Sequence, residues 1–400
     1  MESKKMRMSD EQLIAKDIDI PIELLRDEIL ARLPVKTQLQ IRCVCKLWCS
    51  VIDSQDFRLN PNIRKTPHLI YIHSENNGLT SDQCIVTLRN VDTFEIINHL
   101  CKMYGSYEFY GTCNGLMLMS QKLFGDKSIL RVWNPSIQKS LLLPSCPLNS
   151  EPQHRLTYML GYPSSDGDNN FKVAAFKCHP GSSLLGGSYV SIAIYSSRGH
   201  RWSSVIKRND VLFPPSLTDR VFYQGAWYWI TKTNLVSFDF NLEDFIFQEL
   251  PVEVMQGEVT RFIFLLCEKL AILSVSSKCF CVWVMDKDRR KMPSWRPWLS
   301  RDTTHEALDK ICDLQYIHSR IFYNERDSDT FIFQDTKKVF SYKFSTQQKQ
   351  ILRSPYESEV ILDAYAESLV LHKGTDGQIL TSYPSHDKTV VAWPTLEDHW

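Results

Sequence analysis

Strand-like runs rich in aromatic and β-branched residues recur along most of this 400-residue chain after its first 60 residues. The runs are HLIYIH (68–73), CIVTL (84–88), LRVWN (130–134), FKVAAF (171–176), VSIAIYS (190–196), AWYWI (226–230), LVSFDF (235–240), CFCVWVM (279–285), DTFIFQ (329–334) and VFSYKF (339–344). Turn-forming residues separate them, as in the stretch at 163–170. Runs of this composition bounded by turns are typical of β-strands. The large C-terminal part is therefore expected to be almost entirely β.

A loose repeat underlies these runs. Each unit has an aromatic strand, a short polar turn and a second strand of mixed residues. The turns begin at Asn134, Ser196, Asn241, Asp286 and Ser345, at intervals of about 45 to 62 residues. Periods of roughly 40 to 50 residues with several strands per unit are typical of propeller blades, and the length available predicts about six to eight of them. A less regular double sheet is the alternative architecture.

The segment at 18–52 has a different pattern, because it is helical and apolar on more than one side. At 100° per residue, Ile22, Leu25, Ile29 and Leu33 form one stripe that we expect to face inward. Leu24 and Leu30 fall well outside that stripe. A piece of about 45 residues is near the lower limit for a core of its own. Either the rest of the chain or a foreign subunit must cover the remaining apolar surface.

The segment IPIELLRDEILARLPVKTQLQIRCVCKLW resembles the F-box. Ile20-Pro21 matches the usual Leu-Pro start, and the Leu-Pro-Val-Lys of residues 33–36 and the Val-Cys-Lys-x-Trp of residues 44–48 match later motifs. Ile20 and the Gln-Leu-Gln at 38–40 are mild departures from the family pattern. The resemblance implies docking on the small adaptor subunit of cullin–RING ubiquitin ligases and, through it, on the cullin. The residues expected to carry docking are Pro21, Leu24, Leu25, Ile29, Leu30, Pro34, Val35, Leu39, Val44 and Trp48, with Leu24 and Leu30 of most interest.

The β part also resembles a known domain. Ordered motifs such as GTCNGLMLMS, RVWNPSIQKSLLLP and QGAWYWI are similar to the F-box-associated domain of plant F-box proteins, which is related to kelch-type propellers. The similarity extends to S-locus F-box relatives and covers most of residues 66–375. The tract between Leu299 and Asp329 departs most from the family pattern.

The two resemblances together predict an α+β protein organised by segment. We expect a flexible tail at 1–16, a three-helix F-box at 17–64 and an F-box-associated, propeller-like β domain for substrate recognition at 65–400. The resemblance implies a non-catalytic substrate-recognition subunit of an SCF-type E3 ubiquitin ligase, whose protein target is not identified by the sequence. A lectin-like or scaffold propeller acting outside a ubiquitin ligase is the alternative.

Composition limits the function classes. Forty-six basic and 46 acidic residues cancel, and the pI is near 7.1, which argues against binding to nucleic acid or to an anionic membrane. The first residues are polar and lack the apolar core of a secretory signal. The most apolar stretch, at 262–275, is interrupted by Glu268 and Lys269 and is too short to span a bilayer, so it is expected to form two buried strands. Together with twelve cysteines expected to stay reduced, this predicts a cytoplasmic and/or nuclear protein.

No catalytic, cofactor-binding or metal-binding residues are predicted. The sequence lacks a nucleophile elbow, a phosphate loop and a zinc-protease helix. Asp166-x-Asp168-x-Asn170 resembles the start of a calcium loop, but Lys177 takes the place of the required Glu. Cys178 and His179 would point to opposite faces of a strand and so could not form a nucleophile–base pair. An enzyme of the copper-dependent propeller type would need converging Tyr, His and Cys ligands, and the sequence marks no such set.

The aromatic residues fall into two groups. Trp227 and Trp229 share one face of a strand and are expected to pack between blades. The segments at 200–202 and 289–298 are candidate recognition loops, because Trp, Tyr and Arg dominate binding hot spots.

Overall fold

The computed structural model divides the chain into two units, Met1–Lys65 and Thr66–Trp400, and each is considered by itself. It describes residues 20–59, 68–75, 83–104, 106–122, 128–149, 156–163, 170–179, 189–209, 220–255, 260–276, 279–286, 294–302, 320–324, 327, 329–334, 339–352, 357–371 and 380–382. The predicted tail at 1–16 and the calcium-like Asp166 and Asp168 lie outside these ranges. Among the described helices, none is long and apolar enough to cross a membrane.

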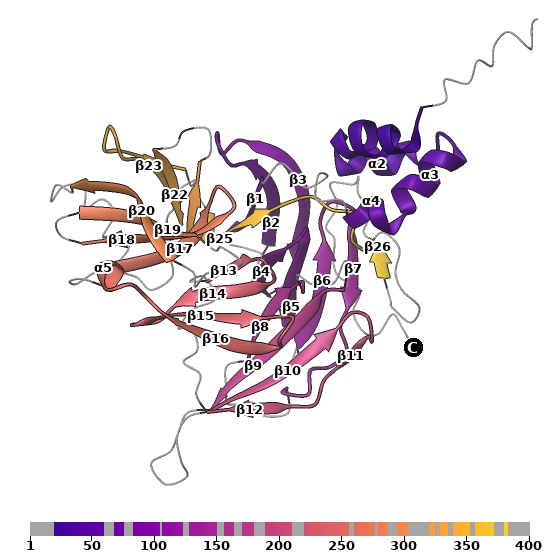
Figure 1. Ribbon diagram of the computed structural model, residues 1–400. Coiled ribbons are helices and arrows are strands. Elements are labelled where there is room, and N and C mark those ends of the chain that lie inside the picture. The colour runs from indigo at the N-terminus through magenta and orange to yellow at the C-terminus, as the bar shows by residue number, and fades with distance from the viewer. Residues whose placement is uncertain are drawn as a thin grey trace, which may run out of the picture. The chain divides into compact units, whose positions relative to one another are not determined.

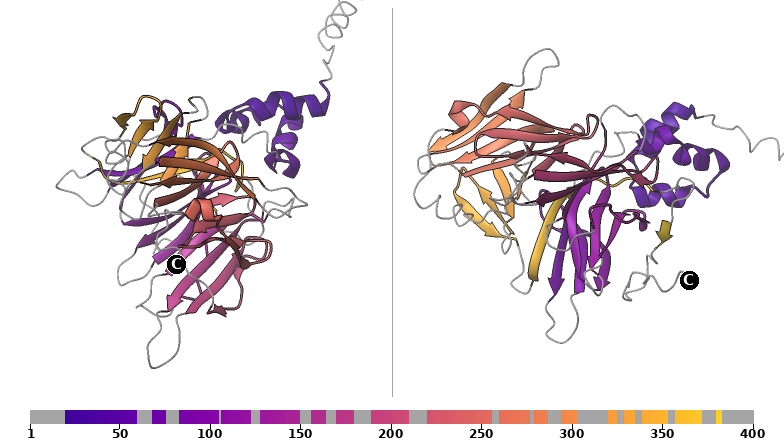
Figure 2. Two further views of the ribbon diagram at one scale, coloured as in Figure 1. Left: turned by 60° about the vertical axis from the view of Figure 1, so that its left-hand side comes forward. Right: turned by 90° about the horizontal axis from the view of Figure 1, so that it is seen from below.

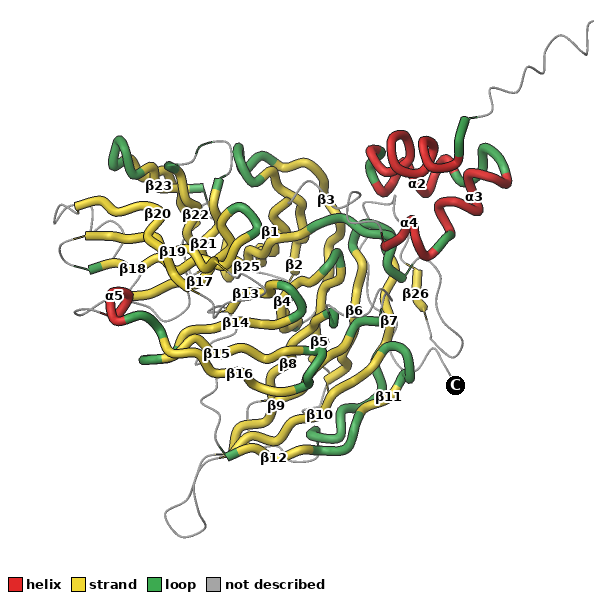
Figure 3. The backbone as a smooth tube through the Cα atoms, viewed as in Figure 1, coloured by secondary structure: helices red, strands yellow, loops and turns green. Residues whose placement is uncertain are grey.

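The N-terminal unit is built from short helices (Figure 3). They are the π-helix η1 (Leu24–Ile29), the 3-10 helix η2 (Leu30–Arg32), and the α-helices α2 (Val35–Ile41), α3 (Lys46–Asp53) and α4 (Gln55–Leu59). Pro34 separates η2 from α2, since the residue before a proline is held extended, as Leu33 is here with ψ 148°. Ser54 starts α4 by accepting a hydrogen bond from the Phe57 amide at 3.2 Å.

The second unit is a six-bladed β-propeller, which settles the predicted range of six to eight blades and rules out the double-sheet alternative (Figure 1). Each blade is an antiparallel sheet. From the axis outward, blade 1 contains β25 (Glu357–Tyr365), β1 (His68–Glu75), β2 (Gln83–Asn90) and β3 (Ile96–Tyr104). Blade 2 contains β4 (Tyr107–Cys113), β5 (Leu116–Lys122), β6 (Ser128–Asn134), β7 (Lys139–Leu142) and β26 (Leu380–Ser382).

The other four blades use consecutive strands. Blade 3 contains β8 (Leu156–Gly161), β9 (Lys172–His179), β10 (Tyr189–Ser196), β11 (Arg201–Trp202) and β12 (Ile206–Arg208), the last two both pairing with β10. Blade 4 contains β13 (Arg220–Tyr223), β14 (Ala226–Ile230), β15 (Asn234–Asp239) and β16 (Asp244–Glu249), and is followed by α5 (Val252–Met255). Blade 5 contains β17 (Thr260–Leu266), β18 (Lys269–Val275), β19 (Cys279–Asp286) and β20 (Ser294–Asp302). Blade 6 contains β21 (Arg320–Tyr323), β22 (Thr330–Gln334), β23 (Val339–Lys343) and β24 (Gln348–Ile351).

The hydrophobic core lies between neighbouring blades. Six clusters of buried residues occupy the six blade-to-blade interfaces in turn. Strand β14 shows why the sequence reads as a continuous apolar run: Trp227 and Trp229 pack toward blade 3, while Ala226 and Tyr228 pack toward blade 5. Because successive side chains alternate between the two faces of a strand, a blade buried on both faces needs apolar residues at nearly every position. The two tryptophans are thus packing residues, as predicted.

The ring closes through the C-terminal part of the chain. Strand β25 pairs antiparallel with β1, so that blade 1 combines residues from both ends of the propeller unit (Figure 2). On the axial side, the Asp363 carboxylate accepts a hydrogen bond from the Thr112 amide of β4 at 2.8 Å. Asp363 also pairs with Arg320 of β21 at 2.6 Å. Blade 1 is therefore tied at the axis to both of its neighbours.

The sequence predictions for individual elements hold closely. Every strand-like run singled out in the sequence coincides with a strand to within two or three residues. The apolar stretch at 262–275 forms two strands joined by a tight turn, as expected. The prediction of recognition loops is wrong at two places, because the backbone there is paired. Residues 294–298 belong to strand β20, which pairs with β19, and Arg201–Trp202 form β11, which pairs with β10. Residues 287–293 and 303–319 lie outside the described ranges.

Candidate functional site

The N-terminal unit exposes large apolar side chains that a helix in water normally buries. Ile22 and Leu24 lie at the start of the first helical segment, and Val44 and Leu47 lie around the turn between α2 and α3; we refer to these four as the exposed apolar set. Leu24 is 50% exposed and Val44 is 60% exposed. Exposed apolar side chains gathered in one small unit indicate a surface that binds a partner.

The predicted docking residues divide into three groups by exposure. Pro21, Leu24, Pro34 and Val44 are exposed; Ile29, Leu39 and Trp48 are partly buried; Leu25, Leu30 and Val35 are buried. The exposed and partly buried residues are available to a partner. The buried ones can contribute only by holding the others in place.

Leu30 corrects the helical-wheel argument. It was expected to lie off the inward stripe, but its exposure is 0%. The reason is that residues 24–29 form a π-helix rather than an α-helix. A π-turn closes i→i+5 hydrogen bonds and takes more residues per turn, so each residue advances by less than 100°. The accumulated lag rotates Leu30 toward the buried face that Leu25 occupies, and leaves Leu24 outside.

Gln38 supports this arrangement from inside the unit. Its side chain is fully buried on α2, and its amide nitrogen donates to the carbonyl oxygens of Leu30 at 3.0 Å and Leu33 at 2.9 Å. Both carbonyls lie at the end of the first helical segment, where the Leu30 carbonyl also accepts from the Leu33 amide at 3.2 Å. Gln38, which the sequence marked only as a departure from the family pattern, thus joins the first segment to α2.

An ion pair fixes the turn that carries Val44. Arg42 contacts Asp53 at the end of α3 through Nε and Nη2, both at 2.8 Å. Hydrogen bonding to Asp53 raises the pKa of Arg42, so the guanidinium stays charged at any physiological pH. The Cys45 sulfur accepts from the Trp48 amide at 3.5 Å and marks the start of α3. Val44 lies between Arg42 and Cys45, so these two interactions hold its backbone in place.

Sequence reasoning missed two members of the exposed apolar set. Ile22 was counted in the inward stripe, and it is 48% exposed because that stripe assumes a regular α-helix. Leu47 was not among the predicted docking residues, and it is 47% exposed. Its neighbour Trp48 was chosen instead because it matches the F-box pattern.

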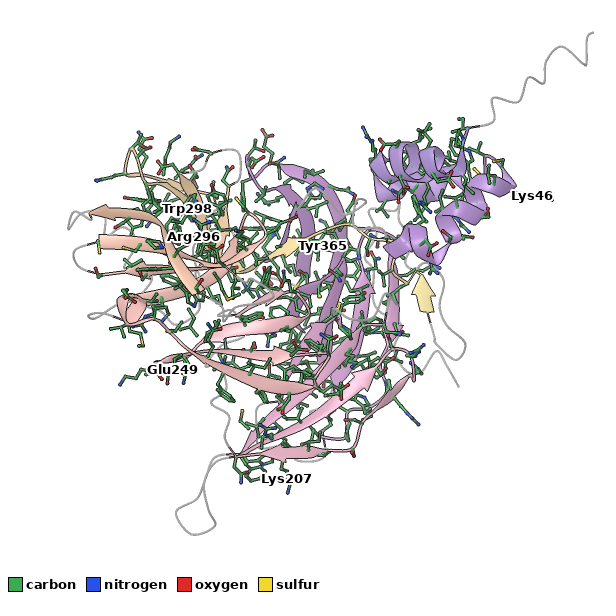
Figure 4. All side chains as sticks on the ribbon, in the orientation of Figure 1. Lys46, Lys207, Glu249, Arg296, Trp298 and Tyr365 are labelled. Carbon is green, nitrogen blue, oxygen red and sulfur yellow. The ribbon has the colours of Figure 1, made fainter. Side chains whose placement is uncertain are left out.

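The propeller offers fewer exposed aromatic residues than its sequence suggests. Trp202 donates from Nε1 to the Pro144 carbonyl at 2.9 Å, and His200 hydrogen-bonds to the Tyr195 hydroxyl at 2.7 Å, so both are tied to the blade surface. Trp298 is 37% exposed on β20 and packs edge-on against Tyr323 (Figure 4). Of the segment proposed as a recognition loop, Trp298 is the large apolar side chain still open to a partner among the described residues.

Two other surface features of the propeller are accessible to a protein target. Exposed apolar side chains lie along the outer strands of blades 3 and 4, where Arg208 of β12 pairs with Asp244 of β16 at 2.6 Å. The apolar residues are Val205, Ile206, Leu242, Ile246, Phe247 and Val252. A polar groove of about 730 Å³ lies between blades 6 and 1 and includes the Asp327–Lys343 ion pair.

Comparison with known proteins agrees with both units. The family described as F-box domain matches residues 18–60, and the family described as F-box associated beta propeller domain matches residues 76–372. An F-box/kelch-repeat protein of Arabidopsis thaliana is 29% identical over 315 residues, which is 70% of this chain and 79% of the relative. The F-box protein CPR1 of the same plant is 23% identical over 387 residues, or 86% of this chain and 88% of the relative.

Among solved structures, the periplasmic gluconolactonase PpgL of Pseudomonas aeruginosa matches 75% of this chain and all of its own, with 10% identity and a TM-score of 0.34. Such a score supports no inference about function. The family matches cover both units and follow the residues that build them. The chain belongs to the F-box proteins that carry an F-box-associated β-propeller domain.

Proposed function

We propose that this protein is the substrate-recognition subunit of an SCF-type cullin–RING ubiquitin ligase. The observation that carries the proposal is the exposed apolar set on the F-box unit, in a chain whose β-propeller also has exposed apolar side chains open to a protein target. The F-box would dock on the small adaptor subunit and, through it, on the cullin. The propeller would bind the protein that is ubiquitinated.

The proposed mechanism requires no bond-making group in this chain. Holding a target close to a ubiquitin-charged enzyme raises its effective concentration at that enzyme, as in any tethered reaction. The narrower kinship with S-locus F-box proteins and the identity of the target remain predictions from sequence. A cytoplasmic and/or nuclear location is part of the same proposal. It is supported by the described cysteines, all of which are thiols, as is usual in reducing compartments.

Replacing Leu24 tests adaptor docking. Leu24→Asp changes an exposed side chain and is expected to leave the fold intact, while placing an unpaired carboxylate in the proposed interface. Burying such a charge costs several kcal/mol, and each ~1.4 kcal/mol lowers affinity tenfold. Copurification of the adaptor with the full chain should therefore be lost.

The matched control is Leu242→Asp, which changes another exposed leucine, on the propeller. That variant should retain the adaptor, and circular dichroism should show unchanged folding for both. Undiminished copurification with Leu24→Asp would contradict the proposal. A wild-type chain that binds neither adaptor nor cullin would favour a scaffold acting outside a ligase.

The receptor role has its own test. When the proteasome is inhibited, wild type and Leu24→Asp should capture the same propeller-bound proteins. Without inhibition, a true target should accumulate only in cells that carry Leu24→Asp, because the target is then bound but not delivered to the ligase. Equal target levels with both forms would argue against a degradative role.

A further inference from the structure

The axis of the propeller contains one buried arginine, Arg220, and one that is nearly buried, Arg320. Arg220 comes from β13 and is 4% exposed, and Arg320 comes from β21 with a side chain 10% exposed. Both strands are the innermost of their blades. A fully buried cation is rare in proteins unless it is paired, because removing a charge from water is costly.

Arg220 spans the axis rather than its own blade. Its Nη2 donates to the carbonyl oxygens of Tyr110 on β4 at 2.7 Å and Tyr158 on β8 at 2.9 Å. Its guanidinium carbon lies 4.9 Å from the ring centre of Trp227. Arg220 therefore contacts the innermost strands of two other blades, and the residues around it are neutral acceptors and a ring.

Positive charge exceeds negative charge in this cluster. Asp363 is the carboxylate that acts on Arg220 among the described residues, and it is already committed to Arg320 at 2.6 Å and to the Thr112 amide at 2.8 Å. Burial and the nearby Arg320 charge lower the pKa of Arg220 to about 9, which is still above neutral, so the side chain stays cationic. Two cations thus share one carboxylate.

Several donors of the two arginines also lack acceptors. Nε and Nη1 of Arg220 and Nε of Arg320 are buried and have no hydrogen-bond partner within the described part of the chain. Buried donors in native proteins are nearly always satisfied, if not by protein then by water or an ion. Here the donors belong to cations and the local charge is positive, so an anion satisfies both the hydrogen bonding and the charge.

We propose that the propeller axis binds a small oxyanion of the phosphate or sulfate class between Arg220 and Arg320. Oxygen acceptors suit guanidinium donors, which present several N–H groups in fixed directions. Because Arg220 is buried, we expect its partner to be a small ion rather than an inserted peptide. The oxyanion would link the inner strands of blades 2, 3, 4 and 6, and it is independent of the adaptor-docking proposal.

Direct binding tests the site. Equilibrium dialysis of the full chain against radiolabelled inorganic phosphate should give one ion bound per chain, displaced by sulfate. At constant ionic strength, the thermal midpoint should rise with phosphate concentration and, above the Kd, continue to rise with its logarithm, because a ligand that binds only the folded state stabilises it by mass action. Absence of bound phosphate and of any such rise in the wild type would overturn the proposal without any variant. Water would then satisfy the arginines.

Substitutions locate the ion. Arg220→Gln and Arg320→Gln should each abolish phosphate binding, whereas Arg208→Gln, at a partly exposed ion pair on blade 3, should leave it unchanged. Should Arg220→Gln fail to fold, Arg320→Gln answers the same question. Binding that persists in a folded Arg220→Gln or Arg320→Gln variant would place the ion elsewhere and refute the site.

Discussion

Individual polar side chains decide how the F-box unit presents its apolar surface. The four members of the exposed apolar set are held by contacts that lie behind them, above all by the buried amide of Gln38 and by the Arg42–Asp53 pair. A unit this small has little core to fix its geometry. Its binding surface therefore depends on a few buried hydrogen bonds.

Gln38→Leu tests this dependence. The substitution keeps an apolar stem but removes the donor shared by the Leu30 and Leu33 carbonyls. The Leu30 carbonyl keeps the Leu33 amide as a donor, whereas the part-buried Leu33 carbonyl loses the Gln38 amide, at a cost of about 1 kcal/mol. The F-box unit should unfold at lower denaturant, and adaptor affinity should fall with it. Gln40→Leu, at an exposed position of the same helix, should be nearly neutral. Equal stability of the two variants in urea titrations would show that the Gln38 bridge contributes nothing.

We expect His68 to make the stability of the propeller sensitive to acid. Burial lowers the pKa of this histidine, which opens β1 next to the closing strand β25. Its pKa in the unfolded chain is about 6.5, so below that pH the unfolded state binds a proton more readily than the folded state does. The stability that His68 contributes is complete above pH 6.5 and declines as the pH falls. Thermal midpoints at pH 7.5 and 5.5 should differ less in His68→Gln than in wild type, and an unchanged difference would exclude this source.

At the scale of elements, Gly115 and Asn134 of blade 2 hold the chain segment that follows the closing strand β25; we call these contacts the latch. Gly115, in the turn between β4 and β5, has φ +77°, and a Cβ there would overlap Ser368 and the Ala366 carbonyl. Asn134, at the end of β6, donates from Nδ2 to the carbonyl oxygens of Ser368 at 2.9 Å and Val370 at 2.7 Å. The chain that follows β25 is therefore held by the turns of blade 2.

Asn134→Leu should open this latch. The change leaves two buried carbonyls without their donor, at a cost of about 1–3 kcal/mol, and the loss should be local to the end of β25. Hydrogen exchange measured by mass spectrometry should speed up in residues 357–371 and stay unchanged in blades 4 and 5. Asn98→Leu, on the exposed strand β3, provides the control. If Asn134→Leu changed the exchange rate equally in all blades, or not at all, Asn134 would have no special role in closing the ring.

The strands could be predicted from the sequence because each strand's pattern is contained in its own residues. The strand pairing that closes the ring could not be predicted, because it joins distant segments. Runs such as AWYWI carry their own pattern of burial, and the sequence placed this strand without error. Pairing of β25 with β1 joins segments at opposite ends of the propeller, and no short-range pattern in β25 specifies that partner. The predicted exposure of Leu30 was wrong for a related reason, since nothing in the sequence distinguishes a π-turn from an α-turn. The axial arginines belong to the same class, because ring closure alone brings them together.

At the scale of the whole molecule, the F-box unit and the propeller are built by different rules. The F-box unit leaves apolar side chains exposed around a small core, while the propeller buries most of the large apolar side chains of its strands between adjacent blades. A partner is therefore expected to cover the first unit without altering the second. Each unit has at least one exposed cysteine, so thiol labelling can show which unit a partner covers.

Thiol labelling of the full chain should separate the two units. Cys43 and Cys45 flank Val44 and are exposed, as is Cys267 in the turn between β17 and β18, whereas burial raises the pKa of Cys101 and Cys178. Since the thiolate is the reactive form, maleimide at neutral pH should label the three exposed cysteines first. Adaptor present at about ten times its Kd should slow labelling of Cys43 and Cys45 roughly tenfold, because only the unbound fraction reacts. Cys267 should keep its rate and serves as the internal control. Protection of Cys267 as well would show that the adaptor also covers the propeller, and no protection at Cys43 and Cys45 would place the docking surface away from Val44.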